Sequence, residues 1–111
     1  MTIEQRKEIF DQTMEQCLAI LSKKGPDYAG LEDVLHNFKE VALDNALTPF
    51  QVLQIYISKH YDRVRNCIKN EPAYPIASGE SVEESLLDMI NYCFLFRCLL
   101  REYGNDEQSK G

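Results

Sequence analysis

Apolar residues recur every three or four positions along four stretches of this chain, a spacing typical of helices with one buried face. The first stretch runs from about Thr2 to Lys24, and Thr2 and Gln5 have the spacing of a capping box. Gly25 and Pro26 end it, because neither residue continues a helix well. Its predicted buried face consists of Phe10, Met14, Cys17, Leu18 and Leu21.

Two further helices are predicted at about Leu31–Leu43 and from Thr48 to about Lys69. The start of the third helix is well marked, because Thr48 is a good N-cap, Pro49 suits the first helical position and Gln51 completes a capping box. The predicted apolar faces are Leu31, Leu35, Phe38 and Ala42 on the second helix, and Leu53, Tyr56, Ile57, Val64, Cys67 and Ile68 on the third.

The fourth helix starts at a second capping box, Ser81 with Glu84, and nearly every residue from 86 to 100 is apolar. Almost its whole circumference is therefore predicted to be buried. Asp88 and Asn91 interrupt this apolar run on one side of the helix, and Glu84 extends that side by one turn. A buried carboxylate needs a partner. Two interpretations stay open: a ligand or cation site, or a satisfied Asp/Asn pair that fixes helix packing.

Four helices with short connections predict a compact all-α bundle. Residues 1–103 form a single domain in this prediction, and residues 104–111 form a frayed polar tail. Aromatic and cysteine residues left on the surface of so small a bundle also predict a homo-oligomer.

A formal net charge of −6 argues against general nucleic-acid binding. The basic residues Lys59, Arg63, Arg65 and Lys69 nevertheless share a stretch with a single acid, Asp62. Such a stretch could hold a small phosphorylated ligand, although a charged run is more often a solvated helix face.

No apolar run is long enough to span a bilayer, and no secretory leader opens the chain. The four cysteines form no CxxC pair and lie among apolar helical positions. They are therefore interpreted as small buried side chains in a reducing cytoplasm rather than as disulfides or zinc ligands.

Three groups of side chains could converge on one site between helices. Cations hold phosphates, aromatic rings stack on bases, and Asp or Asn recognises a base edge or a sugar hydroxyl. The cations are Lys24, Lys59, His60 and Arg63; the polar group is Asp27, Asp33, Asn37, Glu40, Glu84, Asp88 and Asn91; the aromatic group is Tyr28, Phe38, Tyr56 and Tyr92. Together they suit a nucleotide, whereas His60 alone is more typical of a satisfied core histidine.

Four short motifs, in this order and spacing, resemble a family of small bacteriophage proteins: Lys24-Gly25-Pro26-Asp27-Tyr28, Asn37-Phe38-Lys39, Lys59-His60 with Asp62, and Asp88 with Ile90-Asn91-Tyr92. That family is similar to the nucleotide modification associated domain one and, more distantly, to the all-α MazG-like nucleotide pyrophosphohydrolases. The resemblance covers residues 23 to 100. It implies an all-α fold, a phage or prophage origin, and a nucleotide-type ligand met in the cytoplasm of the infected bacterium.

The leading hypothesis is a nucleotide-binding protein without catalysis or cofactor, which sequesters a nucleotide signal and so counters host defence. Lys59, His60 and Arg63 would take phosphate, Tyr28 and Tyr92 would frame the base, and Asp88 and Asn91 would bind its polar edges. The candidate ligand-binding set is Lys24, Asp27, Tyr28, Asn37, Phe38, Lys59, His60, Arg63, Asp88, Asn91 and Tyr92.

Two alternatives stay open. One is a Mg²⁺-dependent nucleotide pyrophosphohydrolase, with Glu40, Glu84 and Asp88 as metal ligands. MazG-like enzymes carry ExxE and ExxD pairs, whereas here Ser85 stands three residues before Asp88, so hydrolysis is the less favoured reading. The other alternative is a structural or protein-interaction bundle, in which the polar residues only fix the packing.

Overall fold

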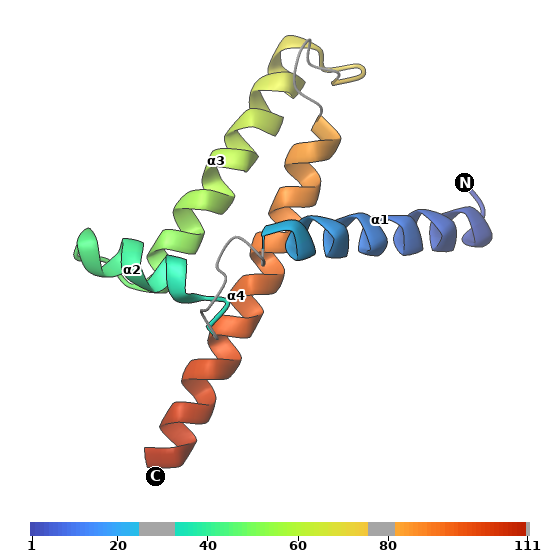
Figure 1. Cartoon of the computed structure of the whole chain (residues 1–111). Coiled ribbons are helices and arrows are strands. Elements are labelled where there is room, and N and C mark those ends of the chain that lie inside the picture. Colours follow the sequence, from blue (N-terminus) through green and yellow to red (C-terminus); the bar gives the residue numbers. More distant parts are fainter. Residues whose placement is uncertain (25–32, 76–81, 111) are drawn as a thin grey trace.

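The computed structural model describes residues 1–24, 33–75 and 82–110, and every element within them is helical. The elements are α1 (Ile3–Lys24), α2 (His36–Asp44), α3 (Pro49–Asn70) and α4 (Val82–Lys110), shown in Figure 1. The predicted all-α bundle of four main helices is confirmed. None of the described helices is sufficiently long and apolar to cross a membrane.

The local signals at two helix starts are confirmed. Thr48 and Gln51 form a complete capping box, with the Gln51 N–H donating to Thr48 Oγ1 at 3.2 Å and the Thr48 N–H donating to Gln51 Oε1 at 2.8 Å. Thr2 and Gln5 make the same reciprocal pair at 3.1 and 2.8 Å. The box predicted at Ser81 involves a residue outside the described ranges.

The second and fourth helices differ from their predicted bounds. α2 begins at His36, because Asp33 Oδ1 accepts a hydrogen bond from the Leu35 N–H at 2.9 Å and holds a turn there. α4 continues to Lys110, through the polar segment that follows residue 103.

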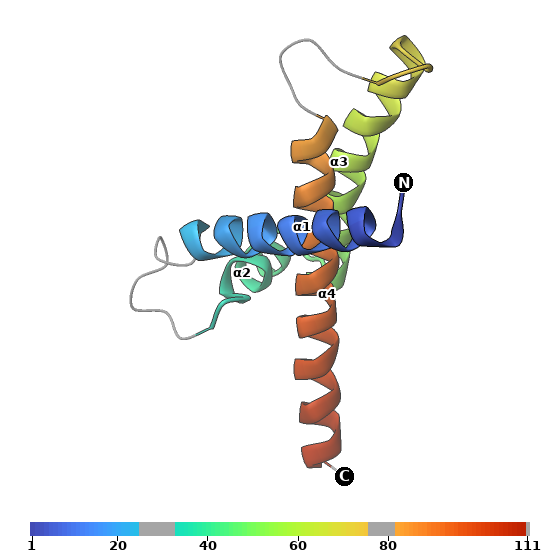
Figure 2. The same cartoon turned by 90° about the vertical axis from the view of Figure 1, so that its right-hand side faces the viewer.

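The bundle is built around α3 and α4, which lie side by side and run in opposite directions (Figures 1 and 2). α2 packs on α3, and α1 crosses α4 instead of running along it. The buried apolar core lies among α2, α3 and α4, and its members are Leu35, Phe38, Ala42, Val52, Leu53 and Leu99. Leu53 and Leu99 are fully buried.

The predicted burial of α1 is wrong for most of its apolar face. Cys17 is buried and Leu21 is half-buried, but Phe10, Met14 and Leu18 are exposed. The reason is geometric: only the second half of α1 meets α4, and the first half extends away from the bundle (Figure 1). The radius of gyration, 16.8 Å, reflects this extension, since a compact domain of this length has about 13 Å.

The predicted burial of the whole α4 circumference is also wrong. Leu86, Ile90, Phe94 and Leu100 are exposed, whereas Tyr92, Phe96 and Leu99 face the core. α3 covers one side of α4 and α1 covers part of another, so a third side has no neighbour within the described residues.

Candidate functional site

Four of the predicted site residues, together with Tyr56, form one cluster between α2, α3 and α4. Tyr56 and His60 stand one turn apart on α3, and Asp88 and Tyr92 stand one turn apart on α4. Because the two helices lie side by side, these two pairs face each other. Phe38 of α2 closes one end. The set Phe38, Tyr56, His60, Asp88 and Tyr92 is called the His60 cluster below.

His60 sits at the centre of this cluster. Its imidazole stacks on the Tyr92 ring, with centroids 5.5 Å apart and planes inclined by 27°. Its Nδ1 lies 3.8 Å from Asp88 Oδ2. That separation is too long for a hydrogen bond, but it places a protonated imidazole within ion-pair range of the carboxylate. The His60 side chain is 11% exposed and that of Asp88 is 27% exposed, so the cluster reaches solvent on the Asp88 side.

The aromatic end of the cluster is closed by packing. Tyr92 lies 5.5 Å from Tyr56, and Phe38 lies 5.9 Å from Tyr56 and 6.3 Å from Tyr92, measured between ring centroids. Phe38 belongs to the buried core. These rings therefore pack together at one end of the cluster. A ligand would reach the other, polar end, which is formed by His60 and Asp88.

Asn91 is buried and joins two helices. Its Nδ2 donates to the Cys17 backbone carbonyl at 3.3 Å, which ties α1 to α4. The Cys17 thiol in turn points to the Leu87 carbonyl, with an Sγ to oxygen distance of 3.9 Å. Burial raises the pKa of the Cys17 thiol, and the nearby Asp88 carboxylate raises it further. The position of Asn91 thus fits the packing interpretation of this residue.

The predicted cations do not gather on one side of α3. Arg63 is half-buried and stands one turn after His60, on the same side of the helix. Lys59 is exposed and points about 100° away from His60. It lines a shallow, open depression on the outer surface of α3 together with Gln54, Ile55, Ser58 and Asp62. The Lys59-His60 pair of the sequence is therefore divided between two surfaces.

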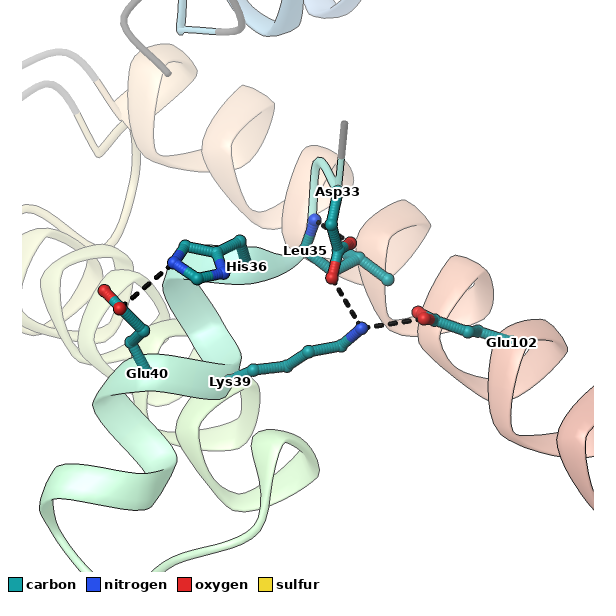
Figure 3. A network of polar contacts seen from close by, with 6 residues as sticks. All are labelled: Asp33, Leu35, His36, Lys39, Glu40 and Glu102. Carbon is teal, nitrogen blue, oxygen red and sulfur yellow. Dashed lines mark hydrogen bonds and ion pairs between the residues drawn. The ribbon is translucent and has the colours of Figure 1, made fainter. Parts of the chain in front are cut away.

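A lysine that was not among the site residues makes the best-defined ion pairs. Lys39 Nζ lies 2.7 Å from Asp33 Oδ2 and 2.7 Å from Glu102 Oε1, as Figure 3 shows. Hydrogen bonds to Asp33 and Glu102 raise the pKa of Lys39, and the bond from Lys39 lowers the pKa of Asp33. This bridge fastens the start of α2 to the second half of α4. The Asp33 carboxylate therefore has a structural role as a partner of Lys39. No local sequence pattern predicts the contact between Lys39 and Glu102, because the two residues are far apart in the chain.

The carboxylates of the hydrolase alternative do not gather either. Glu40 Oε1 lies 3.1 Å from Nε2 of His36, on the outer side of α2 (Figure 3). Glu84 is exposed at the start of α4, and Asp88 lies in the His60 cluster. Across residues 1–24, 33–75 and 82–110, no group of three or more His, Cys, Asp or Glu side chains could hold a metal ion. The arrangement of these three acids gives the magnesium hypothesis no support.

The remaining predicted site residues lie apart from the cluster or outside the description. Asn37 is half-buried on α2, beside Phe38 in the sequence. Lys24 is the last residue of α1, and its side chain is not described. Asp27 and Tyr28 fall outside the described ranges.

Comparisons of the chain with protein-family models, with curated proteins and with solved structures find no match. The features that bear on function are therefore the geometry of the His60 cluster and the motifs of the sequence.

Proposed function

We propose that this protein binds a small nucleotide at the polar end of the His60 cluster and acts by holding it. The observation that carries the proposal is the meeting of His60, Asp88 and Tyr92: a nearly buried imidazole stacked on a ring, 3.8 Å from a carboxylate that reaches solvent. A histidine facing a carboxylate in this position is more than core packing requires, because apolar side chains of similar size would pack there without the cost of burying polar groups.

Each group at this end suits one part of a nucleotide. A protonated His60 and the neighbouring Arg63 would donate charge-assisted hydrogen bonds to phosphate. Asp88 would accept a hydrogen bond from a base amino group or a sugar hydroxyl. The rings of Tyr92 and Tyr56 hold His60 in place from the closed side, so the binding groups are ordered before the ligand arrives.

The biological role follows from the resemblance to small phage proteins. A phage protein that captures a nucleotide signal in the infected cell would weaken host defence by lowering the free concentration of that signal. Capture needs affinity but no metal centre, and the described acids do not form one. In this proposal the protein acts as a homo-oligomer, so that each assembly would carry several nucleotide-binding sites.

The proposal is tested by incubating the purified protein with a mixture of nucleotides and cyclic dinucleotides, removing unbound molecules, denaturing the protein and identifying what was retained by mass spectrometry. One intact nucleotide is expected, with calorimetry giving its affinity. If no nucleotide is retained and none is cleaved in the presence of Mg²⁺, a structural or protein-interaction bundle would be the better explanation. Cleaved products that depend on Mg²⁺ would instead favour the hydrolase.

Two matched lysine and arginine variants locate the site. Arg63→Ala should weaken binding about tenfold or more, because a charge-assisted hydrogen bond to phosphate contributes about 1.5–3 kcal/mol. Lys59→Ala removes an exposed cation from the other surface of the same helix and should leave affinity unchanged. The reverse pattern would move the site to the outer surface of α3.

A further inference from the structure

The apolar face of α1 continues beyond its contact with α4. Residues 3, 10, 14, 17 and 21 follow one another at helical spacing and lie on one side of the helix. Cys17 is buried against α4, whereas Phe10 is 60% exposed and Ile3 is 76% exposed. Figure 1 shows the first half of α1 extending past α4, away from the other helices. Ile3, Phe10 and Met14 are called the α1 row.

This projecting half of α1 has no neighbour among the described helices. Isolated helices shorter than about 12–15 residues are marginal in water. The Thr2–Gln5 capping box stabilises the first turn but contributes only about 1 kcal/mol. Ile3, Phe10 and Met14 nevertheless leave apolar side chains exposed along one side of a helix, and exposed apolar surface of this kind marks an interaction site.

A second apolar row lies on α4. Leu86, Ile90 and Phe94 follow one another at intervals of four, on the side turned away from α3. Their exposed fractions are 44%, 37% and 51%. They are called the α4 row, and they lie beside Leu87 and Asn91, where α1 of the same chain crosses.

We propose that a second copy of this chain covers both rows, with the α1 row of each copy packed on the α4 row of the other around a two-fold axis. In such a dimer every copy gives one row and receives one, so both exposed faces are buried by a single symmetric arrangement. The exposures agree: every member of the two rows is more than one-third exposed, from 37% at Ile90 to 76% at Ile3.

The charges beside the two rows favour this pairing over α1 against α1. The projecting half of α1 is acidic overall, with Glu4, Glu8, Asp11 and Glu15 against Arg6 and Lys7. On the same side of α4 the row is preceded by the exposed acid Glu83 and followed by the exposed bases Arg97 and Arg101, so that side carries a net charge of about +1. Two α1 helices would bring like charges together, whereas α1 against α4 brings opposite charges together.

Sedimentation velocity tests the dimer. The wild-type chain should sediment as a dimer, and Phe10→Asp and Phe94→Asp should each shift it to monomer, with at least a hundredfold weaker association. Leu43→Asp is the matched control, because Leu43 is 82% exposed on α2, outside both rows, and this variant should remain dimeric. Circular dichroism should show that Phe94→Asp keeps its helices, since Phe94 does not belong to the core.

Mixing the two variants tests which rows meet. A Phe10→Asp chain and a Phe94→Asp chain still share one intact contact, between the native α1 row of the second and the native α4 row of the first. They should therefore form a heterodimer weaker than the wild-type dimer. A monomeric wild-type chain, or a Phe94→Asp variant as dimeric as wild type, would overturn the proposal. The nucleotide plays no part in this test, so its outcome is independent of the proposed function.

Discussion

The α3–α4 pair and α1 carry the same kind of apolar periodicity, yet their surroundings differ completely. Leu53 of α3 and Leu99 of α4 are fully buried, whereas Phe10 of α1 is 60% exposed. Periodicity shows that a helix has an apolar face, but it does not show which partner covers that face. On α3 the partner belongs to the same chain; on the first half of α1 no described element covers the face.

The largest expected effect comes from truncating the shared core. Leu53→Ala should lower the free energy of unfolding by about 3 kcal/mol, because it leaves a cavity among packed helices. Phe10→Ala should change it by less than about 0.5 kcal/mol, provided that both are measured in the monomeric Phe94→Asp background. Urea unfolding followed by circular dichroism gives both values. Equal losses would mean that α1 is packed as tightly as α3.

Loss of the hydrogen bond that joins α1 to α4 should have a smaller and more local effect on stability. Asn91→Ala removes the hydrogen bond to the Cys17 carbonyl and should cost about 1–2 kcal/mol. Hydrogen exchange should show the loss of protection concentrated in α1, while α3 stays protected. A uniform loss over all helices would contradict a local role, and Ser85→Ala, at another buried polar position of α4, provides the control.

The Lys39 bridge should contribute about 1 kcal/mol or less, because its three side chains are 30–40% exposed. Its pH dependence has a definite sign. The pKa of Asp33 is lower in the folded state, so its contribution is present above the unfolded value and is lost as the pH falls through the folded one. The pKa of Lys39 is raised, so its contribution is lost only at strongly alkaline pH.

Lys39→Met should therefore flatten the decline in stability on the acid side of pH 4, while Lys59→Met, on an exposed surface of α3, should not. Urea midpoints measured between neutral and acidic pH compare the two. The same acid slope in both variants would show that the bridge is absent in solution.

The smallest effect concerns the reactivity of one thiol. Cys17 is 5% exposed and its pKa is raised by burial and by Asp88, so both access and ionisation slow its alkylation. At mildly alkaline pH, mass spectrometry should find Cys17 modified far more slowly than in urea. Asn91→Ala should speed the reaction by loosening α1. An unchanged rate in that variant would show that α1 stays docked without the hydrogen bond.

Much of the fold could be predicted from the sequence, because helix starts are determined by neighbours. Thr48 and Gln51 form the predicted capping box, and helical spacing in the stretch that follows them identified Leu53 as a core residue. The start of α2 differed, because Asp33 holds a turn through the Leu35 N–H and also pairs with Lys39. Apolar periodicity does not contain this turn, and the second partner of Lys39, Glu102, is distant in the sequence.

The candidate site was predictable only in part, for a related reason. Spacing predicted Asp88 and Asn91 on one side of the fourth helix; Asp88 lies next to His60 of α3, whereas Asn91 bonds the Cys17 carbonyl of α1. Lys59 is adjacent to His60 in the sequence but lies on another surface of α3. Neighbouring residues in a helix diverge by about 100°, so a basic pair in the sequence is seldom a basic pair in space.

Leu99 completes the core, and Glu102 completes the bridge to Lys39. Both residues come late in the chain, whereas the residues they join, Leu35 and Lys39, come early. A growing polypeptide therefore cannot close its core until the ribosome has released position 99. Until then α1, α2 and α3 lack that partner, and their apolar faces are open to chaperones and to other nascent copies. Closure of the core thus waits for residues of α4 that are made long after the residues they join.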